Sequence, residues 1–137
     1  MPISNYTTTI DSMKTVGEVQ KMLIEHDATK IMVESQDKIP TGITFQIGDI
    51  TYRLPANWQG VLKVLERDPK VEKKYKNKEQ AQRTTWRIIL YWVEAQMAII
   101  EAEAATVEEV FLPYAVLKNG NTVYQEFKSN NFKQLGQ

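Results

Sequence analysis

The amino-acid sequence predicts an α+β fold, in which a small antiparallel β-sheet of about three strands packs on helices. The first observation is that residues 42–54 alternate apolar and polar side chains on either side of Gly48-Asp49, as in a hairpin. The second is that residues 77–105 repeat apolar side chains with a helical period. Helical patterns alone follow, so we predict a long central helix and a helical C-terminal half.

Length and composition indicate one folded domain. The 137 residues suffice for a single hydrophobic core, and we predict one α+β domain over 1–137. Within it we expect an extended arm over 1–14, a helix-sheet-helix part over 15–67 and a helical part over 77–128.

Charge and cysteine content exclude several functional classes. There are 17 basic and 17 acidic residues, so the total charge favours neither nucleic acid nor membrane as a partner. Cysteine is absent, which excludes disulfides and thiol chemistry. The N-terminal residues lack the pattern of a secretion signal, and the apolar run 88–100 is shorter than the roughly 20 residues of a membrane span. We therefore expect a cytoplasmic protein without a membrane partner.

The first helix is predicted from a capping box. Thr15 and Glu18 are spaced so that each side chain can accept from the other residue's backbone N–H. Val16, Val19 and Leu23 then form an apolar stripe, and we expect the helix to end near Asp27.

Three strands follow. Residues 30–34 form a short strand candidate, and 42–47 and 50–54 form the hairpin. Gly48 in the first position of a two-residue loop suits a type II′ turn. That turn places three pairs on one covered face of the sheet, namely Ile47 with Ile50, Phe45 with Tyr52, and Ile43 with Leu54.

Two helices and a charged connection come next. Pro55 ends the hairpin, Asn57 caps a helix that ends at Asp68-Pro69, and residues 70–76 form an exposed connection. Asn77 caps the long helix, and Gln80 completes the capping pair.

The long helix is predicted to be covered on two sides. Its residues 88–100 carry one charge, Glu94, and one amide, Gln96. A seam with alternating steps of four and three is typical of helix pairing, and consists of Ala81, Thr85, Ile88, Trp92, Ala95, Ile99 and Ala102. The expected polar strip is narrow and consists of Gln80, Arg83, Arg87, Glu94 and Glu101.

This pattern predicts an oligomer interface on the long helix. We assign to that interface the residues Ile88, Trp92, Gln96 and Ile99. The amide of Gln96 lies near the centre of the apolar side, where it needs a partner. Either a nearby backbone carbonyl or a second Gln96 across a two-fold axis would supply one.

The C-terminal part is predicted to hold short helices. Thr106 and Glu109 form a further capping box, and Pro113 shortens the helix that begins there. Residues 118–121 form a turn, after which Thr122 begins a final short helix.

Catalytic motifs are absent from the sequence. The one histidine, His26, fits the C-terminal end of the first helix. No glycine-rich phosphate loop or Gly-x-Ser-x-Gly motif occurs, and the paired glutamates 101/103 and 108/109 do not face each other on a helix. We predict a non-enzymatic protein with no catalytic residues, no metal site and no cofactor.

One segment is a candidate nucleic-acid interface. Basic side chains with interleaved aromatic rings suit phosphates and stacked bases. The candidate residues are Lys73, Lys74, Lys76, Lys78, Arg83, Trp86 and Arg87. Arg83 and Arg87 are one helical turn apart, so an anion is expected beside them, either phosphate or an acidic residue of the protein itself.

Several stretches resemble small uncharacterised bacteriophage and prophage proteins. They read Phe-Gln-Ile at 45–47, Tyr-Arg-Leu-Pro at 52–55, Trp-Arg-Ile-Ile at 86–89, Trp-Val-Glu-Ala-Gln-Met-Ala at 92–98 and Glu-Val-Phe-Leu-Pro-Tyr at 109–114. The resemblance covers roughly residues 15–127. It implies a phage origin and action inside a bacterial host cell, and it carries no catalytic motif.

These observations predict a homo-oligomeric phage-type interaction protein that binds a host or phage protein. The first alternative is a nucleic-acid-binding accessory of phage replication or recombination that uses the basic segment 73–87. The second alternative is a small-ligand binder with a pocket between the sheet and the long helix.

Overall fold

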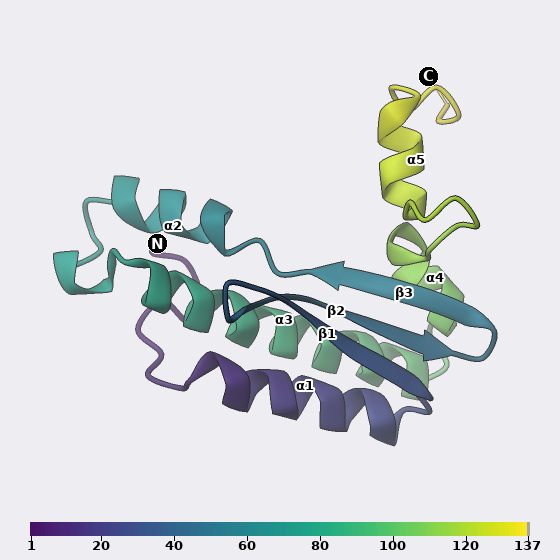
Figure 1. Cartoon of the computed structure of the whole chain (residues 1–137), viewed down its shortest axis with the longest axis horizontal. Coiled ribbons are helices and arrows are strands. Elements are labelled where there is room, and N and C mark those ends of the chain that lie inside the picture. The colour runs from purple at the N-terminus through teal and green to yellow at the C-terminus, as the bar shows by residue number, and fades with distance from the viewer. Residues whose placement is uncertain (137) are drawn as a thin grey trace.

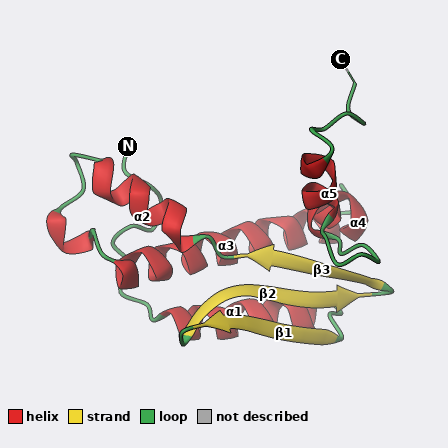
Figure 2. Cartoon of the chain, turned by 45° about the horizontal axis from the view of Figure 1, so that its top comes forward, coloured by secondary structure: helices red, strands yellow, loops and turns green. Residues whose placement is uncertain are grey.

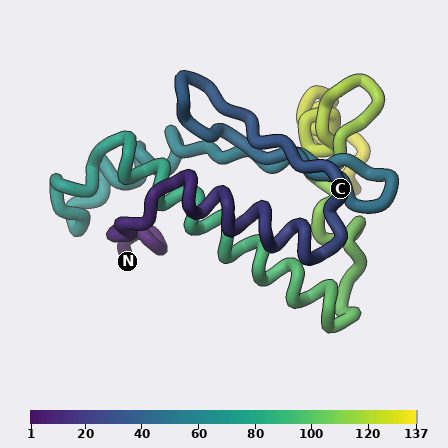
Figure 3. The backbone as a smooth tube through the Cα atoms, turned by 60° about the horizontal axis from the view of Figure 1, so that its bottom comes forward, coloured from purple at the N-terminus to yellow at the C-terminus, as the bar shows by residue number. Residues whose placement is uncertain are grey.

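A three-stranded antiparallel sheet packs on two long helices in the computed structural model, which describes residues 1–136. The strand order is β1-β2-β3. Helices α1 and α3 run side by side along one face of the sheet (Figures 1 and 3). The predicted α+β fold with a long helix and a helical C-terminal part is therefore confirmed.

The elements follow one another with short connections. They are α1 (Ser12–Glu25), β1 (Lys30–Gln36), β2 (Ile39–Ile47), β3 (Ile50–Pro55), α2 (Trp58–Arg67), the 3-10 turn η1 (Lys73–Tyr75), α3 (Lys78–Glu101), α4 (Val107–Phe111), the 3-10 turn η2 (Leu112–Tyr114) and α5 (Val123–Ser129).

Helix α1 begins one turn earlier than the capping box predicts. Its N-cap is Asp11, whose carboxylate accepts from the backbone N–H of Met13 at 3.1 Å. Thr15 lies inside the helix and is fully buried, so the predicted Thr15–Glu18 box is wrong. The side chain of Glu18 is committed to a partner on α3 instead.

The hairpin β2–β3 has the predicted register. Ile43 pairs with Leu54, Phe45 with Tyr52, and Ile47 with Ile50. Gly48 has a φ of +62°, as the first position of a type II′ turn requires. Alternation along both strands therefore places their buried side chains on one face, against α1 and α3.

The turn between β1 and β2 was not predicted. Asp37 and Lys38 both have positive φ, at 52° and 68°, which is the conformation of a type I′ turn. Neither residue is the glycine that usually marks such a turn, so the sequence signal is weak. The turn extends β1 to Gln36 and starts β2 at Ile39, which makes both strands longer than predicted.

Helices α2 and α3 begin at the predicted N-cap residues. The Asn57 side chain accepts from the N–H of Gly60 at 3.1 Å, and the Asn77 side chain accepts from the N–H of Gln80 at 2.9 Å. Asp68 ends α2 before Pro69. Within the predicted exposed connection, however, Val71 is buried against α2 and α3.

The main core lies between the sheet and the helices. It is built from buried side chains of the sheet and of both long helices, which include Val19 and Leu23 of α1, Phe45 and Tyr52 of the sheet, and Trp86 and Val93 of α3. A smaller cluster around Leu65 and Ala81 joins α2 to the first turns of α3. Helix α3 therefore passes through both clusters, which explains its apolar sequence.

Residues 1–11 form an arm that is fastened to α3. The Gln80 amide donates to the carbonyls of Tyr6 and Thr8 at 2.7 and 2.9 Å, and the Thr84 hydroxyl donates to the carbonyl of Asn5 at 3.1 Å. Gln80 is 4% exposed, so its place in the predicted polar strip and its predicted capping bond are both wrong. The free carbonyls of the arm are satisfied by α3 side chains rather than by water.

The C-terminal part projects from the sheet at the far end of α3 from α2 (Figure 1). Capping boxes at Thr106/Glu109 and Thr122/Gln125 begin α4 and α5, and Pro113 limits α4 to one turn. Phe111 anchors this part in the main core, where burial of one such side chain stabilises the fold by about 1.5–3 kcal/mol.

Candidate functional site

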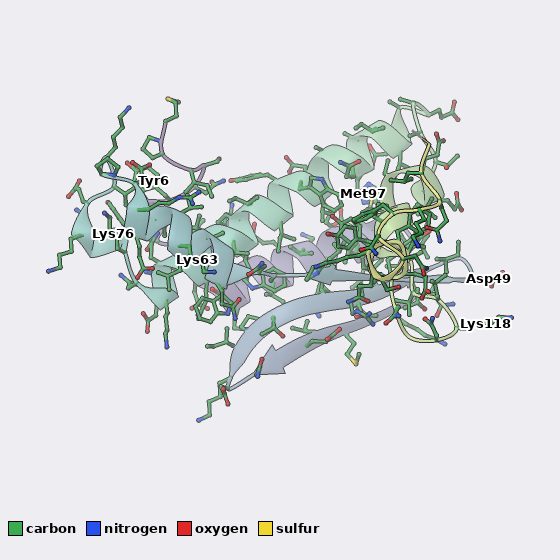
Figure 4. The ribbon with its side chains drawn as sticks, turned by 90° about the horizontal axis from the view of Figure 1, so that it is seen from above. Tyr6, Asp49, Lys63, Lys76, Met97 and Lys118 are labelled. Atoms are coloured by element: carbon green, nitrogen blue, oxygen red, sulfur yellow. The ribbon has the colours of Figure 1, made fainter. Side chains whose placement is uncertain are left out.

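The predicted nucleic-acid residues divide into an exposed and a buried group. Lys73, Lys74 and Lys78 are exposed, and Lys76 is half-buried beside α2. Lys63 of α2 and Lys76 lie at the same end of the molecule (Figure 4). The lysines therefore form a basic surface at the α2 end, which we call the basic end and define as Lys63, Arg67, Lys70, Lys73, Lys74, Lys76 and Lys78.

Trp86 does not belong to this surface. Its side chain is 1% exposed and its indole N–H donates to the carbonyl of Pro40 at 3.2 Å. A buried ring with its one donor satisfied offers no face for a base to stack on. The structure therefore corrects the assignment of Trp86, which is a core residue that ties α3 to β2.

Arg87 is also withdrawn from solvent. Its guanidinium donates to the carboxylate of Glu18 at 3.0 Å, to the Tyr91 hydroxyl at 2.9 Å and to the Thr15 hydroxyl at 3.4 Å. Burial opposes the charge, but the bonds to Tyr91 and Glu18 prevail and raise the pKa of Arg87. The anion expected beside this arginine is thus Glu18 of the same chain, and Arg87 is not free to bind phosphate.

Arg83 is half-buried and is held by its own helix. One of its terminal nitrogens donates to the side-chain oxygen of Gln80 at 2.7 Å. Its Nε is buried and has no partner within the described residues. The exposed lysines alone therefore remain for a nucleic-acid interface.

The predicted oligomer interface lies on the one apolar side of α3 that the chain leaves uncovered. Tyr91 and Ile99 are 45% and 38% exposed, and Ile88 and Trp92 are half-buried beside them. Ala95, Ala98 and Ala102 are exposed between and beyond them. We call this surface the α3 face, which consists of Ile88, Tyr91, Trp92, Ala95, Ala98, Ile99 and Ala102.

The seam to which this face belongs is covered only in its first half. Ala81 and Thr85 are buried, and Ala81 packs with Leu65 of α2. From Ile88 onwards α2 no longer reaches the helix, since α2 lies over the first turns of α3 (Figure 1). The uncovered half of the seam is therefore apolar although it is not part of the core.

The surroundings of Gln96 differ from those predicted. The residue is half-exposed and its amide makes no hydrogen bond with the described residues. Because the amide reaches water, it carries no cost of burial in the single chain. Gln96 borders the α3 face beside Trp92 and Ile99, and its predicted bond to a backbone carbonyl is wrong.

A shallow apolar hollow of about 210 Å³ adjoins the α3 face. Its lining consists of Leu54, Pro55, Ile88, Ile89, Trp92 and Tyr114. Trp92 packs edge-on against the rings of Phe111 and Tyr114, with centroids 5.7 and 5.6 Å apart. The hollow extends the apolar surface from α3 to the end of β3.

A groove of about 590 Å³ lies between α1 and α3. Between the sheet and α3, where a ligand pocket was predicted, Phe45, Tyr52 and Trp86 fill the interior, and the shallow hollow beside Leu54 and Trp92 lies at the edge of that contact. The rim of the groove is charged and includes Lys21, Glu25, Glu94 and the pair His26–Glu101. Among the described residues, no three His, Asp or Glu side chains gather as metal ligands do.

His26 joins the C-terminal ends of α1 and α3. Its Nδ1 lies 2.8 Å from the carbonyl oxygen of Met22, and its Nε2 lies beside the carboxylate of Glu101. Both partners only accept, so the doubly protonated ring satisfies both bonds. The bond to Met22 first, and then Glu101, raise the pKa of His26 above 6.5. The sequence did not reveal the contact between His26 and Glu101, because the two residues are 75 positions apart in the chain.

A second apolar surface lies on the projecting C-terminal part. Leu112, Tyr124, Phe132 and Leu135 are 53%, 51%, 39% and 58% exposed. They line a hollow of about 270 Å³ together with Pro113, Val123 and Phe127. We call this surface the C-terminal cluster. The sequence predicts this cluster only weakly, because its apolar residues are widely spaced along the chain.

No family model, curated protein or solved structure shows significant similarity to the chain. Among the helices of residues 1–136, none combines the length and the apolar character that crossing a membrane requires.

Proposed function

We propose that this protein is a non-enzymatic interaction protein that self-associates through the α3 face and acts on a host or phage protein inside a bacterial cell. The observation that carries the proposal is the α3 face itself. Single exposed apolar side chains are ordinary on a protein surface, but a continuous group of them marks an interaction site.

The α3 face has the composition of an interface centre. It combines two large aromatic side chains, Tyr91 and Trp92, with isoleucines on a rigid helix. Aromatic residues are enriched and charged residues are depleted at the centres of protein interfaces. The charged side chains Glu94 and Glu101 border the face on the side of α1, as in an interface rim.

Substitution of Ile99 tests the proposal. Ile99→Glu places a charge on the α3 face without touching the core, since Ile99 is 38% exposed. We expect the wild-type chain to elute with a dimer mass by light scattering and the variant to elute with a monomer mass. Circular dichroism of both proteins verifies that the fold is kept.

The matched control is Ile24→Glu. Ile24 lies on α1 and is 61% exposed, outside the α3 face. This variant should keep the dimer mass. A monomeric Ile24→Glu protein beside a dimeric Ile99→Glu protein would place self-association on another surface.

We assign the C-terminal cluster to the second partner, a different protein. Helix α5, which carries Val123, Tyr124 and Phe127 of this cluster, projects from the body of the molecule (Figure 2). Phe132→Glu combined with Leu135→Glu should leave the dimer mass unchanged and abolish capture of partners from a host lysate. Equal capture by wild-type and variant protein would contradict this assignment.

Nucleic-acid binding is the second candidate function, and the basic end favours it. Its lysines share the end of the molecule at which α3 begins, so the positive end of the helix dipole adds to their field. Lys73→Glu combined with Lys74→Glu should weaken binding of single-stranded DNA at low salt, where phosphate contacts are strongest. Absence of wild-type binding at low salt would eliminate this candidate.

A further inference from the structure

We propose that a cleft between the outer face of the sheet and helix α5 binds a small zwitterion with the charged groups of an amino acid or a short peptide. Arg53 and Lys128 bind its carboxylate, and Glu34 binds its amine. We call this site the α5 cleft. The inference is independent of the proposed self-association, because the residues that line the α5 cleft do not belong to the α3 face.

The α5 cleft has the size of a small-molecule site. It measures about 380 Å³, within the range of about 300–1,000 Å³ that such sites occupy. Gly42 and Arg53 lie on the face of the sheet opposite α1 and α3, because their neighbours Ile43 and Tyr52 point into the core. Helix α5 supplies the other wall and rises beside β3 (Figure 2). The lining residues on which the proposal depends are Glu34, Gly42, Arg53, Tyr114, Tyr124 and Lys128.

Gly42 of the central strand keeps the α5 cleft open. It pairs with Glu34 of β1 on one side and with Pro55 of β3 on the other. An ideal Cβ at position 42 would lie 3.0 Å from the backbone carbonyl oxygen of Leu54, so a larger residue requires a shift of the backbone. The sheet therefore presents bare backbone at this point, where a ligand can approach closely.

Helix α5 is fastened to β3, so the α5 cleft exists before a ligand binds. The Arg53 guanidinium donates to the carbonyl oxygen of Gly120 at 2.9 Å and to the side-chain oxygen of Gln125 at 3.1 Å. The Val116 N–H donates to the carbonyl oxygen of Thr51 at 2.8 Å, at the edge of the sheet. A site with walls already in place loses little affinity to their ordering.

Arg53 and Lys128 carry positive charges that no acidic side chain neutralises. Arg53 is half-buried, and its two hydrogen-bond partners are neutral oxygens. Within residues 1–136, neither Arg53 nor Lys128 forms an ion pair. The bonds to Gly120 and Gln125 use one terminal nitrogen of Arg53, so its other N–H groups remain for a ligand. A fixed and partly desolvated guanidinium favours a carboxylate beside it.

Glu34 on the opposite wall requires a positive group on the same ligand. Its carboxylate accepts from the Thr44 hydroxyl at 2.8 Å and forms no ion pair with the described basic residues. Strand β2 separates Glu34 from Arg53, so the two charges stand on different sides of the α5 cleft. A purely anionic ligand would be repelled by Glu34, whereas an amine is attracted to it. The charges together therefore select a molecule that carries both signs.

Two aromatic rings provide a surface for an apolar group of the ligand. Tyr124 of α5 is 51% exposed, and Tyr114 is half-buried. Apolar and aromatic side chains with a few placed polar groups are typical of small-molecule sites. An amino acid or short peptide with an apolar side chain therefore fits the α5 cleft better than a ligand with charged groups alone.

The dipeptide alanyl-phenylalanine tests the site by NMR titration of isotope-labelled protein. We expect backbone amide shifts at residues 34, 42 and 125, which line the α5 cleft. Two matched probes each lack one charge, since the N-acetyl form has no amine and the C-terminal amide form has no carboxylate. Each should bind about tenfold more weakly than the dipeptide, because it loses a hydrogen bond between charged groups.

Two variants assign each end of the ligand. Lys128→Gln should weaken binding of the dipeptide by up to about tenfold but leave binding of the amide form unchanged, because that form has no carboxylate. Glu34→Gln should weaken binding of the dipeptide but not of the N-acetyl form. Lys118→Gln is the matched control, since Lys118 is exposed on the turn before α5 and does not line the α5 cleft. It should leave the affinity for every probe unchanged.

The remaining outcomes overturn the inference. Absence of shifts in the α5 cleft with both the dipeptide and free phenylalanine would refute the site, as would shifts confined to another surface. Equal affinities for the dipeptide and its two matched probes would refute the selection of a zwitterion. Self-association is measured separately by light scattering, so none of these results decides it.

Discussion

Two polar residues of α3, Gln80 and Arg87, were predicted to face water and are buried instead. The helical pattern distinguishes polar from apolar side chains but not a solvated polar group from a bonded one. Gln80 holds the N-terminal arm, and Arg87 holds Glu18 of α1. A long arginine can bury its stem and still satisfy its donors, so exposure cannot be predicted from residue type alone.

Replacement of Arg87 should destabilise the fold. In Arg87→Met the Tyr91 and Thr15 hydroxyls and the Glu18 carboxylate all lose a donor. Glu18 is 40% exposed and can recover water, so we expect a loss of about 1–3 kcal/mol in the free energy of unfolding, less than for a fully buried pair. Urea denaturation measures the change.

Arg67→Met is the matched control, since Arg67 is exposed at the end of α2. It should change the free energy of unfolding by less than about 0.5 kcal/mol. Equal losses in the two variants would mean that the network around Arg87 contributes no stability.

The His26–Glu101 contact predicts a pH dependence. The folded state raises the pKa of His26 above 6.5, so it binds the proton more tightly than the unfolded chain does. The resulting stabilisation is complete below pH 6.5 and is lost as the pH rises through the folded-state pKa. In urea denaturation, wild-type stability should therefore fall relative to His26→Gln as the pH rises from 6.5 through the folded-state pKa of His26. Parallel curves for the two proteins would contradict this.

At the scale of elements, the sequence predicted best where local chemistry decides the structure. Asn57, Asn77, Thr106 and Thr122 all cap helices as expected, and Gly48 forms the expected turn. The misses occur where packing decides. Thr15 is buried between α1 and α3, so the helix begins earlier, at a cap with a weaker sequence signal.

Two glycines should respond oppositely to alanine. Gly48 has a φ of +62°, a conformation that costs an L-residue about 1 kcal/mol, so Gly48→Ala should lower stability by about that amount. Gly17 lies within α1, and a Cβ there meets no atom within 4 Å. Gly17→Ala should raise stability by about 0.5–1 kcal/mol. Thermal unfolding of both variants checks the two signs, and stabilisation by Gly48→Ala would contradict the turn.

At the scale of the whole molecule, α3 explains the arrangement of the other parts. Its sides take α1, the sheet, α2 and the N-terminal arm, and the uncovered side of its second half forms the α3 face. The sequence predicted that the helix is covered on two sides and named Ile88, Trp92, Gln96 and Ile99 for an interface.

Which side of α3 stays open was not predictable from periodicity. Ala81 and Ile99 belong to the same seam, yet Ala81 is buried and Ile99 is exposed, because α2 reaches only Ala81. The position of α2 depends on its length and direction, which are tertiary properties. Trp86 lies outside the seam and inserts beneath the sheet, whereas Trp92 lies within the seam and borders the surface.

The most direct test of the central claim is the solution mass of the unmodified chain, measured by sedimentation equilibrium over a dilution series. Self-association through the α3 face predicts twice the monomer mass of 15.8 kDa at high concentration, with reversible dissociation on dilution. A mass of 15.8 kDa at every concentration would contradict it.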